Sequence, residues 1–231
     1  MRRVPTGIEK LDEILQGGFP RGSTILVAGG PGTGKTIFAA QFIYFGAVKY
    51  EEKGVFVTFE ESADFFKDNM LTLGWNFDDL QKKRLVTILD FISIKGAENI
   101  EIVIEEIIKA VKALDAERLV IDSITALTTS LGGTAEIRIM MSILQKALRG
   151  LGCTTLLTTE IPWGESTLGT GVEEFLSDGI ILLEMNPRGN LLRRRLIVLK
   201  MRGTELNLRY YQYNISKNIG IEMLPYPEAG R

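Results

Sequence analysis

One glycine-rich run constrains this chain more than any other part of its sequence. Residues 29–36 read Gly-Gly-Pro-Gly-Thr-Gly-Lys-Thr, which matches the pattern G-x-x-x-x-G-K-[ST]. That pattern requires a strand before the loop and a helix after it. Residues 23–28 form an apolar run typical of a buried strand, and residues 37–50 carry apolar side chains at helical spacing. The sequence therefore predicts a strand, a glycine loop and a helix, as in α/β proteins.

The predicted loop is suited to bind phosphate groups. Its glycines let successive backbone N–H groups point inward, and the N-terminus of the following helix adds positive potential. The Lys35 ammonium is expected to reach the β- and γ-phosphates, and the Thr36 hydroxyl to ligate Mg²⁺. We therefore expect a bound nucleoside triphosphate with Mg²⁺. The expected nucleotide contacts of the loop are Gly30, Pro31, Gly32, Thr33, Gly34, Lys35, Thr36 and Ile37.

Composition excludes several other classes of function. The 231 residues suit one α/β domain over 1–231. Because Cys153 is the one cysteine of the chain, no internal disulfide can form. The absence of histidine excludes Ser-His-Asp and Cys-His catalysis and the common His-containing zinc sites. The net charge of −2 gives no general attraction to nucleic acid. No apolar run reaches the roughly 18 residues of a membrane span, so a cytoplasmic location is expected.

Apolar strands and amphipathic helices alternate along the rest of the chain. Strands are predicted at 55–59, 85–89, 119–121, 154–159 and 180–183, and helices at 8–15, 62–73, 100–114 and 137–151. This alternation indicates a mainly parallel sheet with helices on both faces. A turn-like run at 186–190 and strands at 196–199 and 209–215 predict antiparallel strands at the C-terminal end.

Two carboxylates, Glu60 and Glu61, follow the predicted strand 55–59 directly. In a parallel sheet they lie at the same edge as the glycine loop, where one of them can orient and deprotonate an attacking water. Alternatively, Glu61 only favours the positive end of the next helix, which Ser62 is placed to cap. The apolar face of that helix is expected to consist of Phe65, Phe66, Met70 and Leu73.

Asp122 ends the apolar run 119–121. A carboxylate at the end of a strand, well after a phosphate loop, is the second motif of nucleotide-binding sites, and we expect it to bind Mg²⁺ together with Thr36. Thr159 and Glu160 end a later strand. They either sense the γ-phosphate or mark the boundary between strand and loop, and the sequence leaves both alternatives open.

The motifs together resemble the KaiC-type branch of the RecA superfamily. The resemblance covers nearly the whole chain and is carried by residues 6–8, 17–22, 29–36, 59–61, 74–75, 120–123, 173–179 and 200–204. It implies a RecA-like core, with ATP bound between neighbouring subunits of a ring that is usually a hexamer. KaiC itself, the cyanobacterial clock ATPase, has two such domains in tandem, whereas this chain has one.

The resemblance also implies roles for residues near the C-terminus. In relatives, the residues that match Lys200 and Arg202 reach the γ-phosphate bound by the adjacent subunit, as an arginine finger supplied in trans does. Met201 lies in the same nucleotide-binding run. Thr204, Ser216 and Lys217 match positions that contact nucleotide from the neighbouring subunit.

One departure from the family concerns autophosphorylation. The second domain of KaiC phosphorylates itself on an adjacent Ser-Thr pair, and the matching positions here are Glu174 and Phe175. Neither side chain can accept a phosphate in that way. The chain therefore resembles the first domain of KaiC, which acts only as an ATPase.

Three functions remain compatible with the sequence. The first is a Mg²⁺-dependent ATPase that is slow until its subunits assemble, and the second is a regulatory module in which bound ATP controls a partner protein. The third is a RecA/RadA-like DNA-binding ATPase. DNA binding is disfavoured because the candidate loops 128–136 and 160–173 lack Lys and Arg, with Trp163 as their one stacking residue. The basic cluster Arg193–Arg195 follows the predicted surface turn, where exposed charge is ordinary.

Overall fold

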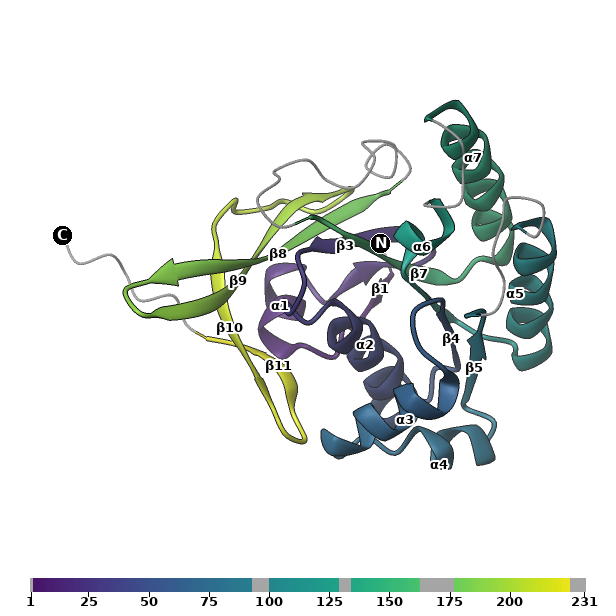
Figure 1. Cartoon of the computed structure of the whole chain (residues 1–231), viewed down its shortest axis with the longest axis horizontal. Coiled ribbons are helices and arrows are strands. Elements are labelled where there is room, and N and C mark those ends of the chain that lie inside the picture. Colours follow the sequence, from purple (N-terminus) through teal and green to yellow (C-terminus); the bar gives the residue numbers. More distant parts are fainter. Residues whose placement is uncertain (1, 93–99, 129–133, 163–176, 225–231) are drawn as a thin grey trace.

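The computed structural model describes residues 2–92, 100–128, 134–162 and 177–224 (Figure 1). Its strands are β1 (Arg3–Val4), β2 (Phe19–Pro20), β3 (Thr24–Gly29), β4 (Gly54–Thr58), β5 (Val86–Asp90), β6 (Arg118–Asp122), β7 (Thr154–Glu160), β8 (Gly179–Arg188), β9 (Leu191–Met201), β10 (Tyr211–Ser216) and β11 (Gly220–Met223). Its helices are α1 (Glu9–Ile14), α2 (Lys35–Tyr50), α3 (Ala63–Thr72), α4 (Phe77–Lys82), α5 (Ile100–Leu114), α6 (Ile124–Thr128) and α7 (Thr134–Leu151).

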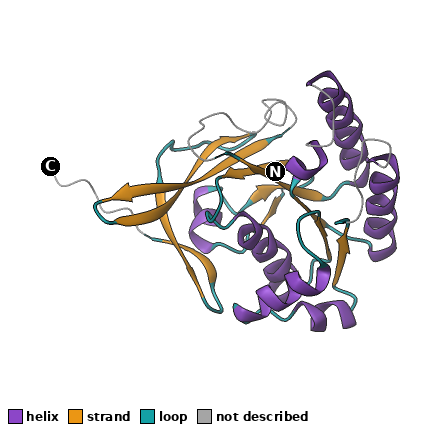
Figure 2. Cartoon of the chain, in the orientation of Figure 1, coloured by secondary structure: helices purple, strands orange, loops and turns teal. Residues whose placement is uncertain are grey.

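Nine of the strands in these ranges form one sheet, in the order β11-β10-β9-β8-β3-β7-β6-β4-β5. The pairs that join β8, β3, β7, β6, β4 and β5 are parallel, whereas those that join β8, β9, β10 and β11 are antiparallel. This confirms the predicted α/β fold, a mainly parallel sheet with antiparallel strands at the C-terminal end. Figure 2 shows helices packed beside the parallel part, while the antiparallel hairpins extend away from it.

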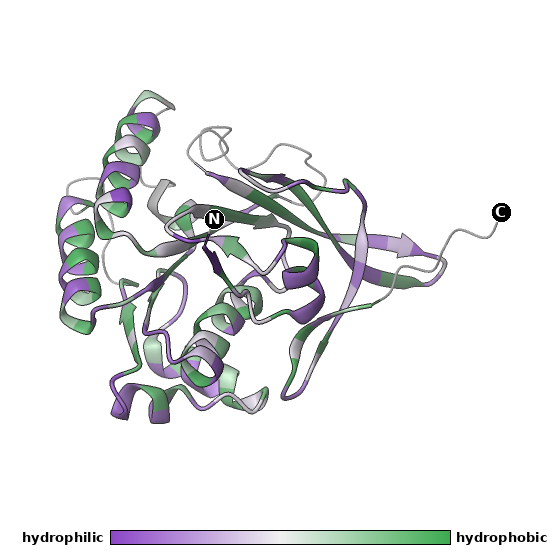
Figure 3. Ribbon diagram, turned by 180° about the vertical axis from the view of Figure 1, so that it is seen from behind, coloured by the Kyte–Doolittle hydropathy of each residue, from purple (hydrophilic) through white to green (hydrophobic). Residues whose placement is uncertain are grey.

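The sheet has a hydrophobic core on each face. Successive side chains of a strand point to opposite faces, so Ile25 and Val27 of β3 pack in the core that includes α1 to α4, while Leu26 packs in the core under α5 and α7. Figure 3 shows the central strands as largely hydrophobic and α5 and α7 as alternating hydrophobic and hydrophilic. A strand buried on both faces reads as a continuous apolar run, which is why the strands were recognisable in the sequence.

The helix after β4 differs from the prediction at one residue. Ser62 caps α3 as expected, since its side chain accepts a hydrogen bond from the Phe65 backbone N–H at 3.2 Å. However, the Phe65 side chain is 59% exposed. Phe66 takes the core position and stacks on Phe56 with ring centroids 4.2 Å apart. Consecutive residues of a helix point in directions about 100° apart, so one face does not hold both phenylalanines.

The C-terminal hairpin is longer than the sequence predicted. The sequence pattern predicts a turn at 186–190, but β8 continues to Arg188 and pairs there with Leu191 of β9. The basic cluster Arg193–Arg195 therefore lies on a strand and does not simply follow a surface turn. Arg195 forms an ion pair with Glu184 at 2.7 Å and stacks on the Tyr210 ring. This ordering of the cluster depends on cross-strand partners, which the local sequence does not reveal.

A buried guanidinium joins three parts of the fold. Arg118, at the start of β6, is fully buried and forms an ion pair with Glu52 at 2.6 Å. It also donates hydrogen bonds to the carbonyl oxygens of Pro5 at 2.9 Å and Phe42 at 2.7 Å. Gly46 is required beside it, because a Cβ at that position would lie 2.4 Å from Arg118 Nε.

Replacing Arg118 by methionine is expected to destabilise the fold by about 3–5 kcal/mol, the usual cost of breaking a buried ion pair. The variant leaves two backbone carbonyls without their donor and Glu52 without its main partner. Urea unfolding measures the difference, with Arg84→Met at an exposed arginine as the control. A loss no larger than that of the control would show that this network contributes little.

Candidate functional site at the end of β3

The loop between β3 and α2 has the backbone that its glycines require. Gly32 and Gly34 have φ angles of +76° and +94°, in the region that favours glycine. The Thr33 hydroxyl donates to the Gly30 carbonyl at 2.8 Å and closes the loop on itself. Helix α2 begins at Lys35, so its N-terminus points to the concave side of the loop.

Two strands support this loop from outside. Tyr213 of β10 donates its hydroxyl to the Thr33 carbonyl at 2.6 Å, and Arg194 of β9 donates Nε to the Gly32 carbonyl at 3.1 Å. Burial raises the pKa of Tyr213 above its usual range, so the phenol remains a donor. The sequence pattern gives no signal for Tyr213, and it indicates only exposed surface charge at Arg194. Both contacts join residues more than 160 positions apart, so no local signal indicated them.

Lys35 lies at the centre of the loop. Its side chain is 9% exposed, and Nζ donates to the Gly30 carbonyl at 3.3 Å. Nζ also lies 3.6 Å from the Glu160 carboxylate, at the end of β7. The structure therefore brings the Glu160 carboxylate next to the lysine that is expected to bind the γ-phosphate. This position is compatible with a role in sensing that phosphate, which is one of the two alternatives left open for Glu160.

Asp122 ends β6 in a buried position with two hydroxyl partners. It is 4% exposed and accepts hydrogen bonds from the side chains of Thr158 and Thr36. Burial raises the pKa of Asp122, while the two hydroxyl groups oppose that increase. A buried carboxylate beside a threonine hydroxyl provides the hard oxygen ligands that Mg²⁺ prefers. The residues present therefore fit this ion.

Glu60 and Glu61 lie at the same edge of the sheet, as predicted, and are held in different ways. Glu60 is exposed and accepts a hydrogen bond from the Ser123 hydroxyl at 2.6 Å. Glu61 is partly buried and accepts one from the Asn69 side chain at 3.0 Å. Burial raises the pKa of Glu61, and the nearby negative charge of Asp122 and Glu60 adds to the increase.

These groups surround one hollow of about 530 Å³ beside the phosphate loop. Its lining includes Thr36, Ile37, Glu60, Glu61, Phe65, Asn69 and Asp122. Ser123, Asn69 and Thr158 are site residues that the sequence pattern does not predict. Ser123 is adjacent to Asp122, so position alone could have indicated it, whereas Asn69 and Thr158 are recognisable only once the strands and helices are placed.

Lys200 and Arg202 lie at the opposite edge of the sheet. Met201 pairs with Gly179 of β8, which lies beside Ile25 near the start of β3, whereas Leu183 lies beside Gly29 at its end. Four residues of strand separate the two edges by about 13 Å. Because of this separation, Lys200 and Arg202 are not placed to reach the phosphate loop of their own chain.

Ser216 and Lys217 do not share that edge. Strand β10 runs antiparallel to β9, so its last residue, Ser216, lies at the edge of the phosphate loop. The neighbouring Ile215 approaches to 2.7 Å of where a Cβ on Gly34 would lie. The strand direction therefore places Ser216 on the side of its own phosphate loop, away from Lys200 and Arg202. Contact with the nucleotide of its own chain is thus an alternative to the expected contact from the neighbouring subunit.

Several predicted features lie outside the described residues. These are Trp163, the matching pair Glu174 and Phe175, and most of the two candidate DNA-binding loops. Among the described helices, none combines the length and apolar character that crossing a bilayer requires.

Comparison with known proteins supports the same interpretation. The family model described as "ATPase: KaiC" matches residues 4–228. A UPF0273 protein of Thermotoga maritima is 36% identical over 243 residues, which cover 100% of this chain and 98% of that protein. The circadian clock oscillator protein KaiC of Thermosynechococcus vestitus is 37% identical over 228 residues, which cover 96% of this chain but 44% of KaiC. The chain thus spans less than half the length of KaiC.

A solved structure extends the comparison to the fold. A KaiC-like protein from the hyperthermophilic archaeon Pyrococcus horikoshii superposes with a TM-score of 0.89 and 42% sequence identity, over 97% of this chain and 99% of that one. The family match, the length covered and the phosphate-loop geometry agree. The chain therefore belongs to the KaiC family of ATPases.

Proposed function

We propose that the chain acts as one ATPase domain, which binds ATP with Mg²⁺ at residues 30–37 and hydrolyses it between neighbouring copies in a hexameric ring. One observation carries the proposal. Glu60, Asp122 and Thr36 converge on the hollow beside the phosphate loop, while Lys200 and Arg202 lie at the opposite edge of the sheet. Each chain therefore carries both halves of a site that needs two chains to be complete.

The first half binds ATP and activates water. Lys35 and the loop backbone bind the β- and γ-phosphates, and Ser216, which follows Ile215 beside Gly34, contacts the nucleotide of its own chain. Thr36 and Asp122 would hold a Mg²⁺ ion, which would neutralise charge on the phosphates. Glu60, oriented by Ser123, positions the attacking water and accepts its proton. Glu61 is a second carboxylate that lines the same hollow, and it assists Glu60 in orienting the attacking water.

The second half comes from the neighbouring copy. Lys200 and Arg202 of one chain reach the γ-phosphate bound by the next and stabilise the charge that develops in the transition state. Met201 and Thr204 belong to the same run and shape this contact. A contact between two different edges is heterologous, and repetition of such a contact closes a ring when the rotation allows.

Replacing Glu60 by glutamine is expected to lower kcat for ATP hydrolysis about 10²-fold or more, because the proton acceptor is lost. ATP binding is expected to remain, since Lys35 and the loop are unchanged. Phosphate release and titration with a fluorescent ATP analogue measure the two effects. The matched control is Glu105→Gln, at an exposed position of α5. Unchanged hydrolysis in Glu60→Gln would favour a regulatory ATP-binding module over an enzyme.

A further inference from the structure

The residues proposed to act on the neighbouring subunit lie on an exposed turn. Arg202, whose side chain is 61% exposed, begins this turn, and Gly203 and Thr204 complete it. Two backbone hydrogen bonds hold it, from Arg202 N to Asp178 O at 2.9 Å and from Thr204 N to Met201 O at 3.2 Å. No regular secondary structure follows in residues 205–210. Side-chain contacts therefore add to these two backbone hydrogen bonds in fixing the position of the turn.

Arg3 of β1 provides the largest set of these contacts. Its Nη1 donates to the Thr204 hydroxyl at 2.7 Å and to the Gly18 carbonyl at 3.3 Å, and its Nη2 donates to the Gly203 carbonyl at 2.8 Å. One guanidinium thus binds two consecutive residues of the turn. Its planar donors have fixed directions, so the contact sets orientation as well as distance.

The backbone at Arg3 is itself held in place. Strand β1 pairs with β2 in the register Arg3 with Pro20, and the next residue, Val4, is 1% exposed. Gly18 has a φ angle of +111°, and a Cβ there would lie 2.2 Å from the Val4 carbonyl oxygen, so β1 is packed tightly against this segment. Arg3 therefore connects the exposed turn to a rigid part of the fold.

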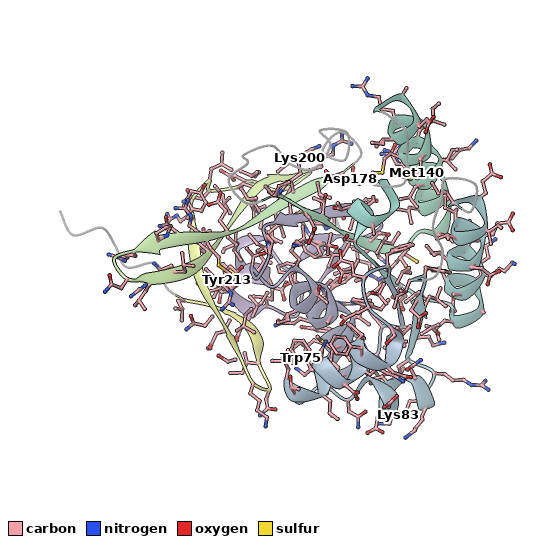
Figure 4. The ribbon with its side chains drawn as sticks, viewed as in Figure 1. Trp75, Lys83, Met140, Asp178, Lys200 and Tyr213 are labelled. Atoms are coloured by element: carbon pink, nitrogen blue, oxygen red, sulfur yellow. The ribbon has the colours of Figure 1, made fainter. Side chains whose placement is uncertain are left out.

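Asp178 holds the turn from the other side. Its Oδ1 accepts from Arg202 Nη1 at 3.2 Å, and its Oδ2 accepts from the Thr24 backbone N–H at 3.1 Å, at the start of β3. The Lys200 ammonium donates to the carbonyl of the preceding Ser177 at 2.7 Å. Figure 4 shows Asp178 and Lys200 near each other, where β8 begins and β9 ends. The Asp178 carboxylate thus connects the Arg202 side chain to the backbone of the central sheet.

We propose that Arg3 and Asp178 are positioning residues for catalysis in trans: they hold the 202–204 turn so that Arg202 meets the nucleotide of the neighbouring copy in one orientation. The inference rests on the proposed function, since it assigns partners to the residues that act in trans. A long exposed side chain loses rotamer freedom when it binds, and anchors that restrict it beforehand lower that cost. Displacement of a catalytic group by about 1 Å is enough to reduce a rate strongly.

The test compares Arg3→Met with Arg2→Met, at the adjacent exposed arginine. Methionine keeps the apolar stem and removes the donors. We expect Arg3→Met to lower kcat about tenfold in protein that native mass shows to be assembled, with Arg2→Met at the wild-type rate. In the Arg202→Ala background, Arg3→Met is expected to have no further effect, because Arg3 acts through Arg202. A merely structural role would lower the rate in both backgrounds.

Asp178→Asn provides an independent variant, which can still accept from Thr24 but no longer offers a carboxylate to Arg202. It is expected to lower kcat in the same direction, again with no further effect when Arg202 is alanine. If Arg202→Ala lowers hydrolysis while both anchor variants retain the wild-type rate, the positioning roles are wrong and the shared site stands. If Arg202→Ala itself has no effect in the assembled protein, the proposed function fails first. Loss of assembly in Arg3→Met with a normal rate in the assembled fraction also contradicts the inference.

Discussion

Replacing Lys35 by alanine is expected to reduce ATP hydrolysis at least about 10²–10³-fold, the usual effect of removing a group that stabilises transition-state charge, and to weaken ATP binding as well. The reason is its position. The ammonium is 9% exposed at the centre of the phosphate loop, where Gly30 and Glu160 orient it. In this water-poor setting its charge acts on the phosphates with little screening.

Phosphate release and nucleotide titration measure both effects. Lys82→Ala is the control, because that lysine on α4 is 78% exposed and lies away from the loop. Thermal unfolding of both variants checks that the fold persists. Hydrolysis by Lys35→Ala at the rate of the control would show that the phosphate loop is not the catalytic site.

Replacing Arg202 by alanine is expected to lower kcat about 10³-fold, within the range of an arginine finger supplied in trans. The affinity of the chain's own loop for ATP is expected to remain unchanged, because Arg202 lies at the opposite edge of the sheet. This separation of rate from binding distinguishes Arg202→Ala from Lys35→Ala, which is expected to affect both.

The matched control for Arg202→Ala is Arg193→Ala. Arg193 is an exposed arginine on β9, the strand that Arg202 follows, and it donates a hydrogen bond to the Gln212 side chain. Native mass must show the same assembly for both variants, so that a lower rate reflects chemistry. A decrease in ATP affinity of an unassembled Arg202→Ala chain would indicate that this arginine serves its own loop, against the strand order.

The features predictable from sequence were those that depend on neighbouring residues. The glycine loop, the buried strand before it and the carboxylates at strand ends all show local patterns, because a parallel sheet places every strand's C-terminal end at one edge. The sequence alone therefore predicts Asp122, Glu60 and Glu61 near Thr36, and the structure brings all four to one hollow.

The features missed depend on strand order and direction. Tyr213 reaches Thr33 across 180 positions, and Arg3 reaches Thr204 across 201. No periodicity indicates such contacts, since they exist only when the C-terminal strands have joined the sheet on the β8 side of β3. The position of Ser216 on the side of its own loop has the same origin, because it follows from the direction of β10.

The shared site is tested most directly by mixing two inactive variants. Lys35→Ala chains keep Arg202, and Arg202→Ala chains keep the phosphate loop, so a ring that contains both has some complete interfaces. At equal amounts and random order, about one quarter of the interfaces of a head-to-tail ring pair an intact loop with an intact arginine. The account predicts that co-expressed mixed rings, identified by native mass, recover about that share of the wild-type rate. Mixed rings that remain as inactive as either variant alone would contradict it.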